Sequence, residues 1–173
     1  MEVWEAIARR ASIRHYRPDD VPPKVIQRIL EAAISAPSAG NAQPWHFWVV
    51  HNAAVKSALS EAAWNQQGVL EAPVVIVVCA VPDASAATYG SRGRDLYCLQ
   101  DTAAAVTTIL LMATALELGA CWVGAFDESR VAAALDQPAG QRPVAIVTLG
   151  YPAEQTKIRT NRRSLSAVSS RID

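Results

Sequence analysis

The 173-residue chain predicts an α+β fold in which a central mixed or antiparallel β-sheet is flanked by helices. Some segments repeat apolar residues with helical spacing and others are continuous apolar runs, but the two kinds do not alternate as a βαβαβ series would. One helical segment carries no charged residue from 102 to 116. A helix that is apolar all round is buried on every side. We therefore expect a homodimer in which this long helix packs partly against the second subunit.

The first two helices are predicted from apolar spacing and from prolines. Val3, Trp4 and Ile7 share one face of a first helix. Pro23 suits the start of a second helix and Pro37 its end. Between these two prolines, apolar residues recur at helical spacing on one face: Ile26, Ile29, Leu30, Ala33 and Ile34.

The remaining elements follow from composition and from capping residues. The β-branched run 73–80 is typical of a buried central strand, and the turn-rich stretch 82–94 predicts a surface loop. Gly119 suits the C′ position that ends the uncharged helix, and Asp127 suits the N-cap of a short helix. The predicted elements are helix 2–10, extended segment 11–23, a helix from 24 to Pro37, strand 46–51, helix 55–66, strand 73–80, loop 82–94, helix 95–119, extended segment 120–126, helix 128–135 and strand 142–150.

Composition favours one globular domain, 1–173, with 151–173 as a polar and basic C-terminal extension. A chain with 51% hydrophobic and 18% charged residues is not disordered. No apolar run is long enough for a signal peptide or a membrane span, so we expect a cytoplasmic protein without a membrane partner. Three cysteines without CxxC or metal spacing predict buried free thiols: Cys79, Cys98 and Cys121.

Positive charge gathers at the two ends of a chain whose formal net charge is zero. This distribution favours one local anion site over a broad nucleic-acid surface, with ordinary solvated charge as the alternative. The basic residues concerned are Arg9, Arg10, Arg14 and Arg17 near the N-terminus, and Lys157, Arg159, Arg162, Arg163 and Arg171 near the C-terminus.

Several common catalytic motifs are absent from the sequence. It contains no GxGxxG dinucleotide fingerprint, no P-loop and no GxSxG nucleophile elbow. The histidines, His15, His46 and His51, lack metal-binding spacing, so no metal site is predicted. Because no side chain stands out as catalytic, an enzyme built on this chain would depend on a cofactor.

Four segments carry the functional prediction. RRASIRHY (9–16) places Arg10, Ser12 and Arg14 on one face of an extended chain, where two guanidiniums and a hydroxyl suit a phosphate or another anion. APSAGNAQPWHF joins a polar, glycine-containing loop to a strand. The others are NQQGVLEAPVVIVV, and WVGAFDESRVAAAL followed by PVAIVTLGYPAEQTKIRTNRRSL. In this order and spacing they resemble the FMN-dependent nitroreductase family, from about the first helix to Leu165.

The resemblance implies a homodimer with two FMN molecules at the interface. It implies that Arg10, Ala11 and Ser12 meet the FMN phosphate or ribityl chain, and that Arg14 lies by the pyrimidine edge of the ring. Pro37, Ser38 and Ala39 would line the cofactor from the second subunit, Asn41 would support that loop, and Gln43 belongs to the same set. The other implied contacts are Asn65 at the ring edge, Val123 and the backbone N–H of Gly124 near the flavin centre, and Arg162 with Arg163 over the phosphate.

The sequence also departs from the family pattern. Gly68 stands where many relatives have a lysine, so a second cation at the flavin N1–O2 edge is missing. Val123 stands where some members have an acid, and Ala11 replaces a larger residue. The segment after Ala80, which helps to cover the substrate in longer members, is compact.

The resemblance implies that NADH or NADPH reduces the cofactor. A nitroaromatic, quinone-like or related small acceptor then takes the electrons at the same site, which gives ping-pong kinetics. One rival is another flavin reaction on this fold, such as dehalogenation, enoyl or azoline oxidoreduction, or flavin breakdown, which product analysis would separate. The other is a non-enzymatic flavin-binding protein or a flavin-free dimer, which would hold no reducible FMN.

Overall fold

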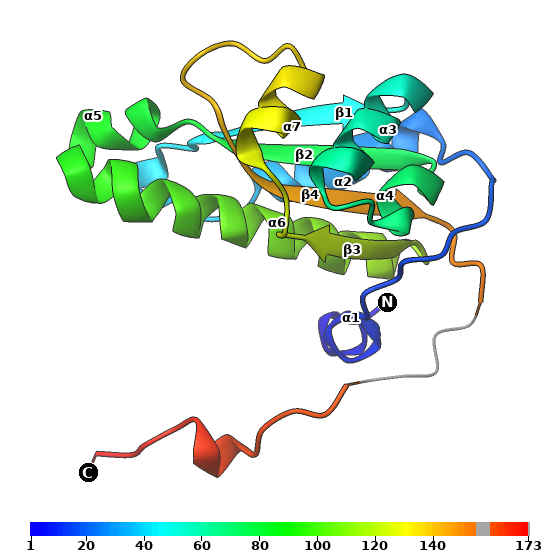
Figure 1. Ribbon diagram of the computed structural model, residues 1–173. Helices are drawn as coiled ribbons and strands as arrows, with labels where there is room; N and C mark the ends of the chain where they lie inside the picture. The colour runs from blue at the N-terminus through cyan, green and yellow to red at the C-terminus, as the bar shows by residue number, and fades with distance from the viewer. Residues whose placement is uncertain (155–159, 173) are drawn as a thin grey trace.

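The computed structural model describes residues 1–154 and 160–172. Its centre is a four-stranded antiparallel sheet in the order β1-β2-β4-β3 (Figure 1). The α+β prediction is therefore confirmed. β2 is buried at every position because helices cover both faces of the sheet. The strands are β1 (Trp45–Val50), β2 (Val74–Ala80), β3 (Gly119–Val123) and β4 (Arg142–Gly150).

Two groups of helices bury the two faces of the sheet. On one face, α2 (Pro23–Ile34) and α6 (Cys98–Ala115) form a core with the sheet around Ile29 and Ile109. On the other face a second core gathers around Leu59, with helices α3 (Ala53–Ala62), α4 (Gln67–Glu71) and α7 (Glu128–Ala134). The N-terminal helix α1 (Val3–Arg9) lies against α6.

The predicted surface loop 82–94 is wrong. The segment forms helix α5 (Pro82–Arg92), followed by a π-helical turn (Gly93–Tyr97) that runs into α6. Pro82 occupies the first turn, where its missing N–H costs nothing, and the alanine-rich stretch behind it favours a helix. The turn formers act within the helix: Gly90 (φ 54°, ψ −137°) bends it without ending it.

The predicted end of the uncharged helix is also wrong. Glu117, not Gly119, adopts the left-handed backbone (φ 62°) after α6. The amide of Leu118 donates to the carbonyl of Ala113 (2.8 Å), and that of Glu117 to Thr114 (3.0 Å), which is the Schellman pattern. Burial of Leu118 sets this earlier stop, and Gly119 begins β3 instead.

Two further differences concern the region between β1 and β2. The predicted helix 55–66 ends at Ala62, because Trp64 and Asn65 take left-handed backbone angles (φ 59° and 58°) and turn the chain. Helix α4 was not predicted, since five residues are too few to show apolar periodicity. This turn brings α4 beside the N-terminal segment, where the candidate site lies.

Helix α6 buries only one face within the protomer. Ile109 and Ala105 are inaccessible, whereas the opposite side, which includes Ala104 and Leu111, is half-exposed. The stretch Pro82–Ala115 is long and apolar enough to cross a membrane by length and composition alone, but 44% of its apolar window is buried inside the protein. Its packing on the sheet and on α2 is that of a core helix in a soluble fold.

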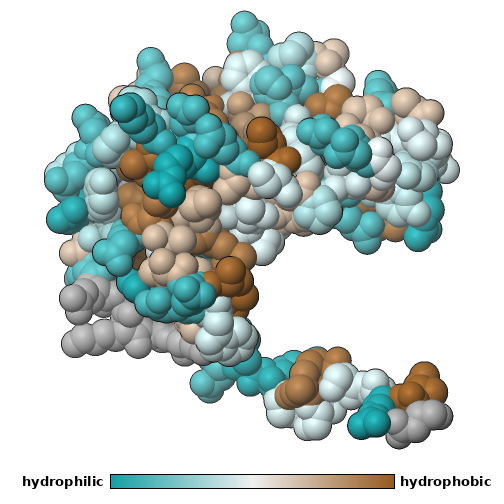
Figure 2. All heavy atoms as spheres, turned by 180° about the vertical axis from the view of Figure 1, so that it is seen from behind, coloured by the Kyte–Doolittle hydropathy of each residue, from teal (hydrophilic) through white to brown (hydrophobic). Residues whose placement is uncertain are grey.

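The C-terminal segment stands away from the body of the protein (Figure 1). Within 160–172 its single regular feature is a short 3₁₀ turn, Leu165–Ala167. Leu165, Val168 and Ile172 are exposed along it, and Figure 2 shows apolar side chains on this projecting tail as well as on the body above it.

Candidate functional site

The predicted anion-binding segment lies along the outer edge of β3. Helix α1 ends at Arg9, and the chain then runs extended past β3. Ser12 forms a parallel bridge with Ala120, and the amide of Ile13 donates to the carbonyl of Ala120 (3.0 Å). Backbone pairing therefore fixes the segment, and the side chains on either side of Ile13 are free for other contacts.

The structure brings the side chains of Arg10, Ser12 and Arg14 together around Cys121 on β3. Burial raises the pKa of the Cys121 thiol, while the charge of Arg14, a hydrogen bond from Ser12 and the charge of Arg10 lower it. All three predicted groups thus act on one point of the strand. The alternation that predicted a common face is consistent with this arrangement.

The two site arginines lack the partners that their neighbours have. Arg9 pairs with Glu5 (3.2 Å) and Arg17 with Asp19 (3.3 Å). Among residues 1–154 and 160–172, neither Arg10 nor Arg14 pairs with a carboxylate. Guanidiniums without a carboxylate are available for an anionic ligand.

A cavity of about 220 Å³ opens beside this segment. One side is apolar and comes from the sheet, and the opposite side comes from α4 and the turn before it. Its lining residues are Arg14, His15, Gln66, Gln67, Gly68, Val69, Cys121, Val123 and Thr148. Pockets that enclose a cofactor-sized ligand usually measure roughly 300–1,000 Å³. The cavity in one protomer is therefore large enough for part of such a ligand, such as one end of an aromatic ring system.

A buried tyrosine that the sequence analysis missed supports Arg14. The Tyr16 hydroxyl lies 2.6 Å from Thr148 Oγ1 and 2.5 Å from the carbonyl of Ile13, which accepts its hydrogen bond. Burial raises the pKa of Tyr16, and the hydrogen bond with Thr148 opposes this effect. Tyr16 thereby connects Ile13, on the other side of Arg14, to β4 and holds the backbone around Arg14. The sequence offered one indication of this role, since Tyr16 lies two residues after Arg14 in the same extended segment.

Gly68 is required by close packing of α4 on the N-terminal segment. A Cβ at this position would lie 2.9 Å from the backbone carbonyl oxygen of Arg14. The absence of a lysine here is thus explained, since any side chain would displace the backbone of Arg14. Nearby, Asn65 is exposed in the left-handed turn before α4 and does not line the cavity, whereas the adjacent Gln66 does.

Val123 and Gly124, the two cofactor contacts predicted at the end of β3, border different cavities. Val123 faces the cavity beside Arg14. Gly124 instead borders a second cavity of about 310 Å³, which lies between the start of β4 and the first half of α6. The structure thus places the two residues on opposite sides of the strand.

The predicted loop Pro37–Gln43 lies elsewhere in the protomer. It contains a 3₁₀ turn (Ala39–Asn41), and the amide of Ala39 donates to Asp101 Oδ1 in the first turn of α6 (3.1 Å). Ser38 Oγ accepts from the amide of Gln43 (3.0 Å). No residue of this loop, all of which the structure describes, lines the cavity beside Arg14.

The C-terminal arginines are not brought to Arg10 within the protomer. Arg162 donates to the carbonyl of Thr160 (3.0 Å), and Arg163 to that of Ala167 (2.8 Å), so both bind within the exposed tail. Lys157 and Arg159 lie outside the described residues.

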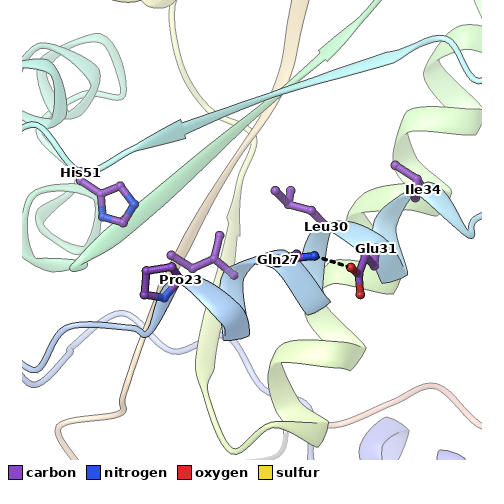
Figure 3. A pocket seen from close by; sticks show the side chains of 7 residues that line it. Pro23, Gln27, Leu30, Glu31, Ile34 and His51 are labelled. Atoms are coloured by element: carbon purple, nitrogen blue, oxygen red, sulfur yellow. Dashed lines mark hydrogen bonds between the residues drawn. The ribbon is translucent and has the colours of Figure 1, made fainter.

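A groove of about 450 Å³ lies along α2 and shares no residue with the predicted site. Figure 3 shows Leu30 and Ile34 from α2 along it, with His51 beyond the end of β1. Its polar groups are largely satisfied, since Gln27 donates to Glu31 (2.8 Å). A binding site combines an apolar wall with convergent free polar groups. The cavity beside Arg14 meets this criterion better than the larger groove.

Comparison with known proteins identifies the family of the chain. A family model described as "Nitroreductase family" matches residues 7–70 and 61–151. A Thermus thermophilus protein named NADH dehydrogenase is 38% identical, with 90% of this chain aligned to 89% of that protein. The chain belongs to the nitroreductase family. This nitroreductase-family protein is accordingly an NAD(P)H-dependent flavin oxidoreductase.

Other relatives show how far the fold and its chemistry extend. The structure of B. megaterium NfrA2 matches with a TM-score of 0.90 at 25% identity, covering 100% of this chain and 75% of that one. A Rhodospirillum rubrum protein named 5,6-dimethylbenzimidazole synthase is 31% identical over 86% of this chain and 81% of its own. Members of this family therefore carry names for more than one reaction.

Proposed function

We propose that the protein is an FMN-dependent oxidoreductase that takes electrons from NADH or NADPH and delivers them to a small organic acceptor. The observation that carries this proposal is the pair of arginines without carboxylate partners, Arg10 and Arg14, with Ser12 between them at the edge of an apolar cavity. These residues fit a ligand with a phosphate at one end and an aromatic ring at the other.

Arg10 and Ser12 are proposed to hold the phosphate end. A guanidinium and a hydroxyl can both donate hydrogen bonds to phosphate oxygens, and the backbone of Ser12 is fixed against β3. Ala11 lies between them and contributes no donor. Arg162 and Arg163 would join this site only if the C-terminal tail lies differently in the assembled protein.

Arg14 and the cavity are proposed to hold the ring. FMN would supply two-electron redox chemistry when bound. Arg14 lines the cavity, where its charge would favour negative charge on a bound ring, and Cys121 and Val123 would form the apolar wall. Asn65, which lies outside the cavity, would donate to the part of the ring that extends beyond it. The protein has no lysine at Gly68, so Arg14 is the only proposed cation at this edge.

The site is proposed to be completed by a second copy of the chain. The loop Pro37–Gln43 lies away from the Arg14 cavity of the same protomer. The half-exposed side of α6 is an apolar surface that a second copy of the chain could bury. In a homodimer, this loop would reach the cofactor of the second protomer. Sedimentation at micromolar concentration should show a dimer, and a monomer that still holds flavin would contradict the arrangement.

One site serving donor and acceptor in turn predicts ping-pong kinetics. Initial-rate lines at several fixed donor concentrations should run parallel, and intersecting lines would reject the mechanism. The proposed acceptors are nitroaromatics, quinones or related small molecules, the acceptors that the family resemblance implies. Three buried free cysteines favour a reducing, cytoplasmic compartment.

A second candidate is a different flavin reaction on the same site. The similarity to a protein named 5,6-dimethylbenzimidazole synthase favours keeping it. Mass spectrometry of the products, after reduction and exposure to oxygen, separates the candidates. Intact FMN with a reduced added acceptor supports the first, and consumption of the flavin itself supports the second.

A further inference from the structure

Asp101 is a buried carboxylate that connects the Pro37–Gln43 loop to α6. It is 7% exposed, and its Oδ1 accepts the amide of Ala39 at 3.1 Å, across 62 positions of sequence. Its second oxygen, Oδ2, is buried and has no hydrogen-bond partner in the described part of the chain. Burying a carboxylate costs free energy, so a buried acid such as Asp101 is expected to have a structural or functional role.

Helix capping does not explain this acid. Tyr97 and Cys98 already have helical backbone angles (φ −65°, ψ −41° and φ −59°, ψ −31°), because α6 continues directly from the preceding π-helical turn. The amides near Asp101 therefore lie inside a continuous helix and are not free ends. The stabilisation that an acidic residue gains at a free helix N-terminus is largely absent here.

The loop that Asp101 contacts has an unusual backbone. Gly40, Asn41 and Gln43 all have positive φ values, of 55°, 57° and 49°. A side chain such as that of Gln43 adopts this geometry at a cost, so the surrounding structure must hold it. Several hydrogen bonds support the loop from within, among them the bond from the Gln43 amide to Ser38 Oγ, and the bond from the Ala39 amide to Asp101 ties it to α6.

The charge on Asp101 is consistent with this anchoring role. Burial raises the pKa of Asp101, and the hydrogen bond from the Ala39 amide lowers it. The contact with Ala39 thus favours the ionised form, which is the stronger acceptor. The anchor needs only one oxygen, and this leaves Oδ2 unpaired.

We propose that Asp101 is a positioning residue that holds the Pro37–Gln43 loop in its cofactor-binding conformation. This inference rests on the proposed function, because the loop acts on the FMN of the second protomer. Asp101 itself touches neither donor nor acceptor. Since one oxygen carries the contact, an asparagine should replace it, whereas an alanine should not.

The test uses the full-length protein and compares Asp101→Ala, Asp101→Asn and Thr102→Ala. Thr102 is the matched control: it is 1% exposed in the same turn, and its hydroxyl donates to the carbonyls of Cys98 and Leu99 within the helix. Hydrogen exchange of the Ala39 amide is measured in cofactor-free protein, and FMN affinity by fluorescence titration.

In Asp101→Ala the Ala39 amide should exchange at least about 10-fold faster, and FMN affinity should fall about 10- to 100-fold. Asp101→Asn should stay within about 3-fold of the parent protein in both measurements. Thr102→Ala should also stay within about 3-fold, even if it lowers overall stability. Should Asp101→Ala fold poorly, Ala39→Pro removes the donor instead and should weaken FMN binding similarly.

Three results would overturn the inference while leaving the proposed function intact. These are unchanged exchange at Ala39 in Asp101→Ala, unchanged FMN affinity in both Asp101→Ala and Ala39→Pro, or an equal loss in Thr102→Ala. By contrast, a parent protein that binds no FMN at all would overturn the proposed function. In that case exchange at Ala39 would still report whether Asp101 holds the loop.

Discussion

In the Arg10–Arg14 segment the edge of β3 holds the backbone and the arginine side chains are left unpaired. In the Pro37–Gln43 loop, by contrast, the backbone itself adopts the unusual geometry. The first region supplies charge from long side chains, and the second supplies shape from left-handed angles supported by Asp101. Both regions carry residues that the sequence predicts as cofactor contacts, yet we expect them to respond to mutation in different ways.

The two regions should therefore respond to different changes, one to salt concentration and the other to backbone substitutions. Binding that depends on charge-assisted hydrogen bonds should weaken as salt screens the charges. Binding that depends on a preformed backbone should respond to glycine and hydrogen-bond substitutions and hardly to salt.

Removing both unpaired arginines should have the largest effect. Arg10→Ala with Arg14→Ala should lower FMN affinity by about 100-fold or more, because each hydrogen bond to a charged group contributes about 1.5–3 kcal/mol. Fluorescence titration at low and high salt measures it. The matched control is Arg9→Ala with Arg17→Ala, whose arginines already have carboxylate partners. Equal losses in the two double variants would break the comparison.

Gly68→Ala tests whether α4 sets the position of Arg14. An alanine normally stabilises a helix interior by about 1 kcal/mol over glycine. Here its Cβ would approach the Arg14 carbonyl oxygen to 2.9 Å, so unfolding free energy should instead fall by about 1–3 kcal/mol. Urea denaturation measures the sign. Gln67→Ala, in the same turn but exposed, should change stability by less than about 0.5 kcal/mol. A stabilised Gly68→Ala would contradict the close contact.

Gly40→Ala tests the loop through its backbone. An alanine in the left-handed region costs about 1–2 kcal/mol, and its Cβ would also approach Tyr89 Oη to 2.5 Å. FMN affinity should fall about 10-fold, to a similar extent at low and high salt. Adding Tyr89→Phe removes the shortest steric contact, that with the hydroxyl, and leaves the backbone angle unchanged, so the double variant should recover only part of the loss. Full recovery would mean that the backbone angle is unimportant.

The smallest expected effect is the contribution of the Asp101 carboxyl to the pH dependence of the unfolding free energy. Burial raises the pKa of Asp101 in the folded state, so the folded protein binds its proton more tightly than the unfolded chain does. The resulting destabilisation is absent below the unfolded pKa and complete above the folded one. From pH 4 to pH 7, unfolding free energy should therefore fall relative to that of Asp101→Asn. A parallel pH dependence in the two proteins would show that this carboxyl does not titrate differently on folding.

The sequence predicted the elements that have strong local signals. The β-branched run of β2, the long apolar stretch of α6 and the Asp127 cap, whose carboxylate accepts a hydrogen bond from the Arg130 amide (3.0 Å), follow from periodicity and capping chemistry. It failed at 82–94, because turn-forming residues can also bend a helix. It missed α4 because five residues show no period.

The candidate site was predictable where alternation places side chains on one face, as for Arg10, Ser12 and Arg14. Contacts between distant segments were not predictable. Asp101 lies 62 positions from Ala39, and Tyr16 reaches Thr148 across 132 positions. Neither pairing leaves a local pattern in the sequence.

The most direct test of the central claim is a visible absorption spectrum of the purified protein, before and after anaerobic addition of NADH or NADPH. The account predicts a yellow protein, or one that turns yellow with added FMN, whose flavin absorption bleaches on addition of the donor. A colourless protein that FMN does not reconstitute would contradict it, and the resemblance would then be one of fold alone.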